Sequence, residues 1–135
     1  MAEIIPAIIA HCMNNATVKA AFSTRIYGNK IADVPGGASQ VFPYARMREI
    51  TTDNIYSHIG NSGRVVLVQV DVFDDDESNA NANSELIRFA FDGYKGMIGS
   101  TINAGMVKAR RVSQEWMSED RNFQRILEIE VMTND

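Results

Sequence analysis

Strict alternation of apolar and polar residues marks the stretch from Arg64 to Asp74. Four valines share one side of it: Val66, Val68, Val70 and Val72. Because successive side chains of a strand point to opposite faces, this pattern predicts a strand with one buried face. The other side is mixed: Leu67, Gln69, Asp71 and Phe73. A face of that mixed character is typical of protein–protein contacts, so we expect this side of the strand to meet a partner.

A long helix is predicted directly after the valine strand. The acidic run Asp74–Asp76 ends the strand, and either Asp76 or Ser78 can cap the helix, where carboxylates favour the positive end of its dipole. Charged residues at helical spacing form one solvated stripe: Glu85, Arg88, Asp92 and Lys95. We expect a wide apolar face opposite this stripe, packed across the valine strand: Leu86, Ile87, Phe89, Ala90, Phe91, Tyr94 and Met97.

The segment before Pro43 is predicted to begin with helices. Pro6 suits the first turn of a helix, where its missing N–H is no loss. Four elements are expected in order: a helix from about Glu3 to Met13, a short helix over Thr17–Phe22, a brief extended piece at Arg25–Tyr27 and a loop from Lys30 to Phe42.

Two hairpins complete the expected fold. In the first, a strand from Pro43 to about Tyr56 joins the valine strand through the turn-rich Ser57–Gly63. In the second, Met106–Met117 pairs with Phe123–Met132, after a loose stretch from Met97 to Gly105. The sequence therefore predicts an α+β fold: a mixed or antiparallel sheet of four to five strands, with the long central helix and the N-terminal helix packed on one face. The 135 residues are expected to form a single domain, residues 1–135.

Composition narrows the class of protein. The formal net charge of -4 and the isoelectric point near 5.1 disfavour non-specific binding to duplex DNA, which requires a positive surface. A single cysteine, Cys12, excludes an internal disulfide and fits a reducing cytoplasm. No apolar run approaches the roughly 20 residues of a membrane span, and Glu3 stands where a signal peptide would carry Lys or Arg. We expect a cytosolic protein without a membrane partner.

Catalytic and metal-binding patterns are weak. His11 and His58 have no neighbouring acid in the sequence to orient them, and no nucleophile-elbow pattern is present. Parts of a calcium loop do occur: Asp74, Asp76, Ser78 and Glu85. Asn79 nevertheless occupies the position that needs glycine, and helix capping explains the same acids. The sequence therefore predicts no catalytic residue, no metal site and no cofactor.

Outward-facing residues on the strands are the candidate contact residues. Arg46 and Arg48 face away from the core of the first hairpin, and residues 58–62 form its tip. Lys108 and Arg110 project from one face of a later strand, either as a solvated surface or as a contact for an acidic partner. The full set of interface candidates is Arg46, Arg48, His58, Ile59, Asn61, Arg64, Leu67, Gln69, Asp71, Phe73, Lys108 and Arg110.

The order of these elements resembles that of a known family. An N-terminal helix is followed by RIYGN, a Pro/Gly loop, VFPYARM and VVLVQVDVFDDD, and after the long helix the chain closes with RILEIEV. This order resembles the tail-completion family of long-tailed phages, the tail terminator proteins. The resemblance runs from Ile4 to Val131 and lies in element order and apolar pattern, so it transfers no site residue position by position.

The resemblance implies a non-enzymatic virion protein. Such subunits form a hexameric ring at the head-proximal end of the tail, after assembly in the host cytoplasm. The ring caps the tail tube protein and docks to head connector proteins, and DNA passes through its bore without specific binding. An acidic lining would avoid contacts with phosphates. Two alternatives stay open: a head–tail joining (connector) subunit, and a small-ligand enzyme, which would need a pocket with convergent polar groups.

Overall fold

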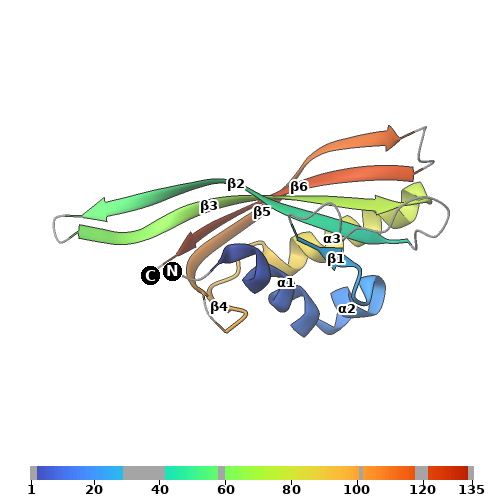
Figure 1. The fold of residues 1–135 in the computed structure, drawn as a ribbon. Helices are drawn as coiled ribbons and strands as arrows, with labels where there is room; N and C mark the ends of the chain where they lie inside the picture. Colours follow the sequence, from blue (N-terminus) through green and yellow to red (C-terminus); the bar gives the residue numbers. More distant parts are fainter. Residues whose placement is uncertain (1–2, 29–41, 58–59, 101, 118–121, 134–135) are drawn as a thin grey trace.

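One curved sheet runs through the molecule, and three helices lie against one of its faces (Figure 1). This computed structural model describes residues 3–28, 42–57, 60–100, 102–117 and 122–133. The helices are α1 (Ile4–Asn14), α2 (Ala16–Phe22) and α3 (Glu77–Phe91). The strands are β1 (Ile26–Tyr27), β2 (Tyr44–Ser57), β3 (Gly60–Asp74), β4 (Gly96–Ile98), β5 (Ile102–Met117) and β6 (Asn122–Thr133).

Six strands of the described chain form the sheet, in the order β1-β2-β3-β6-β5-β4. β1 runs parallel to β2, and every other neighbouring pair is antiparallel. The α+β class, the mixed sheet and both hairpins are confirmed. The predicted count of four to five strands is wrong, because β4 forms inside the stretch expected to be loose. β4 has three residues, too few for a periodic pattern to reveal it.

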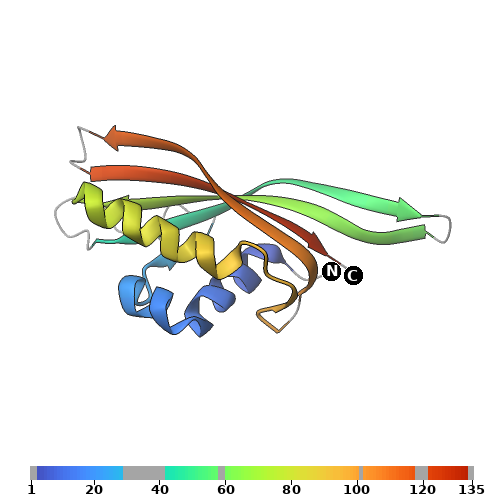
Figure 2. The ribbon, with the colours of Figure 1, turned by 180° about the vertical axis from the view of Figure 1, so that it is seen from behind.

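The core lies between the sheet and the helices. The four valines of β3 are fully buried on the helix side, together with Ile87 and Phe91 of α3. Figure 2 shows α3 lying across the sheet on this side. From β6 the core receives Leu127, Ile129 and Val131, which alternate as the sequence predicts.

The buried face of α3 is narrower than the sequence suggests. Its buried positions are Ala80, Ser84, Ile87 and Phe91, spaced by four, three and four residues. Phe89 lies about 200° around the helix from Ile87, at roughly 100° per residue, and its side chain is 67% exposed. Met97 falls in β4 and is 47% exposed. Both residues were expected in the core, and both lie at the surface.

The caps and turns around the helices follow their local sequence. The backbone N–H of Asn79 donates to Oδ1 of Asp76 at 2.9 Å, so the predicted cap at Asp76 is confirmed. Gly99 has a positive φ of 61°, and a Cβ there would come within 3.2 Å of the carbonyl oxygen of Ala7. Only glycine therefore fits where the turn after β4 meets α1.

Candidate interaction surface

Many of the predicted contact residues lie on one face of the sheet, opposite the helices, which we call the outer face. In the register of the β2–β3 pair, Arg46 is opposite Asp71 and Arg48 is opposite Gln69. Through β6 the same rows continue to β5. The structure therefore brings together eight candidates from three strands: Arg46, Arg48, Leu67, Gln69, Asp71, Phe73, Lys108 and Arg110.

A polar network at the centre of the outer face accounts for its mixed sequence pattern. The guanidinium of Arg46 donates to Oδ2 of Asp71 at 3.1 Å, and Nε2 of Gln69 donates to Oδ1 of Asp71 at 2.9 Å. Arg48 in turn donates to Oε1 of Gln69 at 3.2 Å. Asp71 is only 1% exposed, so its carboxylate is compensated by these two donors rather than by bulk water.

Aromatic rings cover the end of the outer face near the start of β2. Tyr44 stacks on Phe73 with ring centroids 4.7 Å apart, and Phe42 lies 5.7 Å from Tyr44. The guanidinium of Arg46 lies 6.0 Å from the Phe73 ring centroid, where a cation is attracted to the ring face. These contacts bury Phe73, so it rigidifies the outer face rather than offering a free apolar anchor.

Charged side chains dominate the other end of the outer face. Glu128 and Glu130 of β6 lie between the β3 and β5 candidates, opposite Arg110 and Lys108. Arg110 and Glu128 approach to 3.4 Å. A depression of about 480 Å³ lies here, lined by Leu67, Asp92, Lys108, Ala109, Arg110, Glu128 and Glu130. The two glutamates were absent from the candidate set, although their alternation with the core residues of β6 places them on this face.

Of the remaining candidates, Arg64 does not join this surface. Arg64 is 5% exposed and lies on the helix side of β3, where its backbone N–H donates to the Thr133 hydroxyl at 3.1 Å. The alternation that puts Leu67 outward puts Arg64 inward. His58 and Ile59 lie outside the described residues. The backbone of Asn61 pairs with Tyr56 in the first hairpin.

Two residues with catalytic potential, His11 and Cys12, are used in packing. Nε2 of His11 lies 3.1 Å from the carbonyl oxygen of Ala90, and the ring contacts those of Phe91 and Tyr94 at centroid distances of 4.7 and 4.6 Å. His11 thus ties α1 to α3. Cys12 is fully buried, and burial raises the pKa of its thiol to about 12. A thiol in that environment stays protonated and is a poor nucleophile.

The acidic run after β3 organises the start of α3. Asp74 is buried and accepts from the backbone N–H of Asp76 at 3.2 Å and from the Asn83 side chain at 3.0 Å. Burial raises the pKa of Asp74 above its ordinary value. Across the described ranges, no group of three or more His, Cys, Asp or Glu residues is placed to hold a metal ion.

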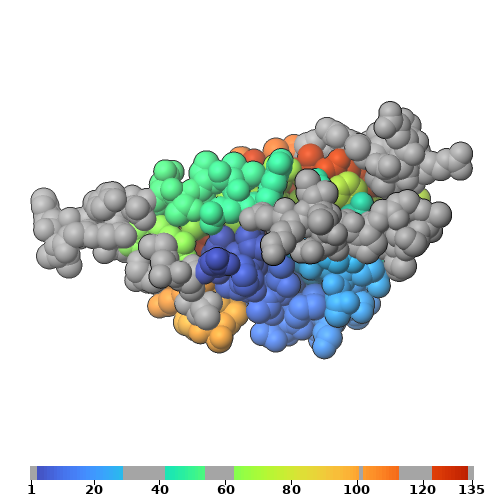
Figure 3. All heavy atoms as spheres, in the orientation of Figure 1, coloured from blue at the N-terminus to red at the C-terminus, as the bar shows by residue number. Residues whose placement is uncertain are grey.

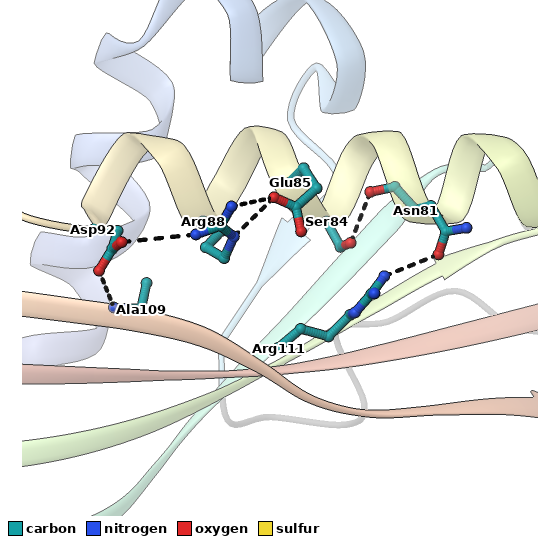
Figure 4. A network of polar contacts seen from close by, with 7 residues as sticks. All are labelled: Asn81, Ser84, Glu85, Arg88, Asp92, Ala109 and Arg111. Atoms are coloured by element: carbon teal, nitrogen blue, oxygen red, sulfur yellow. Dashed lines mark hydrogen bonds and ion pairs between the residues drawn. The ribbon is translucent and has the colours of Figure 1, made fainter.

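A buried arginine beneath α3 was not anticipated from the sequence. Arg125 of β6 is 2% exposed, and its Nε donates to Oδ1 of Asn81 at 2.6 Å. Glu77 provides an opposite charge at 3.5 Å. Arg111 of β5 also donates to Oδ1 of Asn81, at 3.2 Å (Figure 4). Together the two arginines join this helix amide to two strands.

Comparisons with known proteins identify the fold. No protein-family model matches the chain, and no curated protein matches it. Among solved structures, it matches a chain of the virion of a native gene transfer agent (GTA) particle, with a TM-score of 0.73 and 15% sequence identity. The match covers 96% of this chain and 93% of that chain, so the two share a fold over nearly their whole lengths. No helix in the described ranges is long and apolar enough to cross a membrane.

Proposed function

We propose that this chain is a structural virion protein, and that within the virion it is a tail terminator subunit. Six copies would form a ring that caps the head-proximal end of the tail tube and docks it to the head connector. The observation that carries this proposal is the shared fold with a chain of a GTA virion, over 96% of the present chain. The order of sequence elements, which resembles the tail terminator family, supports the same assignment.

The outer face supports a role in protein contacts. It is charged and internally hydrogen-bonded, and it carries a depression of about 480 Å³. Polar, hydrogen-bonding groups form the rim of typical protein–protein interfaces, around a more apolar core. The net charge of -4 suits a bore through which DNA slides without binding, because affinity for phosphates requires a positive surface.

The packing of the reactive side chains supports a non-enzymatic role. His11 contacts a backbone carbonyl rather than a carboxylate, and the Cys12 thiol is buried. A nucleophile activated by a correctly oriented base needs the opposite arrangement, with the reactive group exposed to substrate.

A head–tail joining subunit is the alternative within the same class, because the matched particle is a whole virion. Binding of the gold-labelled chain to purified tail tubes and to purified DNA-filled heads, followed by electron microscopy, separates the two. A terminator labels one end of free tubes and leaves tubes already joined to heads unlabelled, since that end is occupied. Label on the head connectors alone would favour the joining subunit, and label on neither would contradict both.

A further inference from the structure

Among the residues that the structure describes, the outer backbone edges of β2 and β5 have little cover. β1 pairs with β2 at Ala45 and Arg46, and beyond them no described strand pairs with the outer side of residues 47–57. At the other border, β4 pairs with residues 102–104 of β5. The turn after α3 occupies two more hydrogen-bonding groups on the edge of β5. The Gly93 N–H donates to the Val107 carbonyl, and Asp92 accepts from the Ala109 N–H (Figure 4). From residue 110 to 117, no described strand lies beyond β5.

Each of these edges carries a bulge with an exposed branched aliphatic residue. In β2 the register shifts between Glu49 and Thr51, which leaves Ile50 as the extra residue. In β5 it shifts between Arg111 and Ser113, which leaves Val112. Ile50 is 43% exposed and Val112 is 48% exposed. Edge strands of monomeric proteins are usually protected by charge, proline, cover or a bulge, and an exposed apolar side chain is not among these devices. Here the extra residue of each bulge is an exposed apolar side chain, which favours a contact.

The charges beside the two bulges are complementary. Near Ile50, the exposed stretch from Arg48 to Asp53 carries two acids, Glu49 and Asp53, and one base. Near Val112, β5 carries three bases and no acid between residues 108 and 112: Lys108, Arg110 and Arg111. Figure 3 shows the described part of β2 as a band on the molecular surface, above α1 and α2. An acidic edge and a basic edge attract each other, whereas two copies of either edge repel.

We propose that the β2 edge of one subunit pairs with the β5 edge of a second copy of this chain. β2, β3, β6 and β5 follow one another through three antiparallel pairings, so β2 and β5 run in opposite directions. A neighbour placed head to tail therefore meets β2 with an antiparallel β5, and the two sheets become continuous. Such a contact uses two different surfaces of each subunit and can close into a ring. The contact between the two edges is argued from the structure alone, and only its closure into a ring rests on the proposed function.

The geometry of the pairing agrees with a closed sheet. Arg48 and Arg110 lie in the same row of the sheet, through Gln69 and Glu128. Ile50 is two residues further along β2, and Val112 is two residues further along β5 in the opposite direction. If Ile50 of one subunit lies opposite Val112 of the next, the second subunit is displaced along the strand direction by about four residues. At about 3.3 Å per residue this displacement is ~13 Å. The four strands β2, β3, β6 and β5 together are ~19 Å wide. A displacement of ~13 Å over this width tilts the strands by roughly 35° from the axis of the ring, which falls in the range of closed sheets.

Disulfide trapping with variants that each carry one added cysteine tests the pairing. Ile50→Cys and Val112→Cys each replace an exposed side chain, and native Cys12 is fully buried. We expect that oxidation of the equimolar mixture yields a dimer containing one of each variant, while either variant alone stays monomeric. The double variant should give a ladder of larger species. The matched control is a mixture of Lys19→Cys and Ala82→Cys, two exposed helical positions. It should cross-link at least roughly tenfold more slowly than the mixture of Ile50→Cys and Val112→Cys.

Two results would overturn the pairing. Dimers formed by one variant alone would indicate a two-fold contact, and cross-linking no faster than the control would indicate no contact between the edges. Circular dichroism of each variant establishes that it is folded. The outcome is independent of the tail assay: cross-linking without binding to tubes would contradict the terminator role alone, and binding to tubes without cross-linking would contradict the pairing alone.

Discussion

Arg46 on β2 and Asp71 on β3 form a 3.1 Å ion pair on the outer face of the sheet, and the Asp71 side chain is 2% exposed. A carboxylate at such a position is costly unless donors surround it. Arg46 and Gln69 provide them, and Arg48 extends the network by binding Gln69. The pair explains how a strand can bury valines on one side and still hold a buried aspartate on the other.

Replacing Arg46 should therefore destabilise the fold more than replacing Arg48. Arg46→Ala leaves the buried Asp71 carboxylate with one donor, and we expect it to lower the free energy of unfolding by about 2 kcal/mol. Arg48→Ala removes an exposed hydrogen bond to a neutral amide and should cost less than about 1 kcal/mol. Urea denaturation at pH 7 measures both. Equal losses would show that the Arg46–Asp71 pair does not stabilise the sheet.

The two phenylalanines of α3 should differ sharply in how much each stabilises the fold. Phe91 is fully buried, so Phe91→Ala should cost about 3–5 kcal/mol through lost burial and a cavity. Phe89 is 67% exposed, and its ring contacts the Arg88 guanidinium at 4.5 Å, so Phe89→Ala should cost less than about 1 kcal/mol. Thermal unfolding of the two variants beside the natural chain compares them. A large loss of stability from Phe89→Ala would contradict the observed orientation of α3, which places Phe89 on its exposed side.

Much of this architecture can be predicted from the sequence. Both hairpins, the valine side of β3 and the capping of α3 follow from alternation and local hydrogen bonding, which depend on near neighbours in the chain. Arg125 could not be assigned in this way. It lies at an inward position of β6, and its burial depends on Asn81 and Glu77, which approach from a helix distant in sequence. The bulges at Ile50 and Val112 likewise arise from strand pairing and leave no local signal.

The candidate surface could be predicted in part. The outward positions of β2, β3 and β5 follow from period-two alternation, but their grouping requires the strand order. β6 lies between β3 and β5, so Glu128 and Glu130 complete the surface although they are far along the chain from β3. Arg64 shows the opposite case: it was a contact candidate, whereas the alternation of β3 buries it.

Stability in alkaline solution should depend on Cys12. Burial raises the pKa of its thiol from 9.0 to about 12, so the folded state disfavours the thiolate. The free energy of unfolding is therefore unaffected by this thiol below pH 9. It falls as the pH rises from 9 towards 12, because the thiol ionises in the unfolded state and stays protonated in the folded state. At pH 10.5 the loss is about 2 kcal/mol, at 1.36 kcal/mol per pH unit. Urea denaturation at pH 8 and 10.5 should show this extra loss in the natural chain relative to Cys12→Ala. An identical pH dependence would contradict the burial of the thiol.

Calcium should not affect the stability of the chain. Asp76 already caps α3, and Asp74 is bonded to Asn83 and to a backbone N–H. We expect millimolar calcium to shift the melting temperature by less than about 1 °C, because a ligand stabilises a fold only when it binds the native state. A rise of several degrees that disappears in Glu85→Gln would instead indicate a calcium loop.

Termination of the tail is the central claim, and the length distribution of tails assembled without this chain tests it most directly. The measurement is electron microscopy of particles from cells in which the gene for the chain is deleted, beside the same cells supplied with the natural chain. The account predicts free heads and separate tails that are longer and more variable than those of complete particles, with both defects corrected by the natural chain. Tails of ordinary, uniform length in the absence of the chain would contradict it.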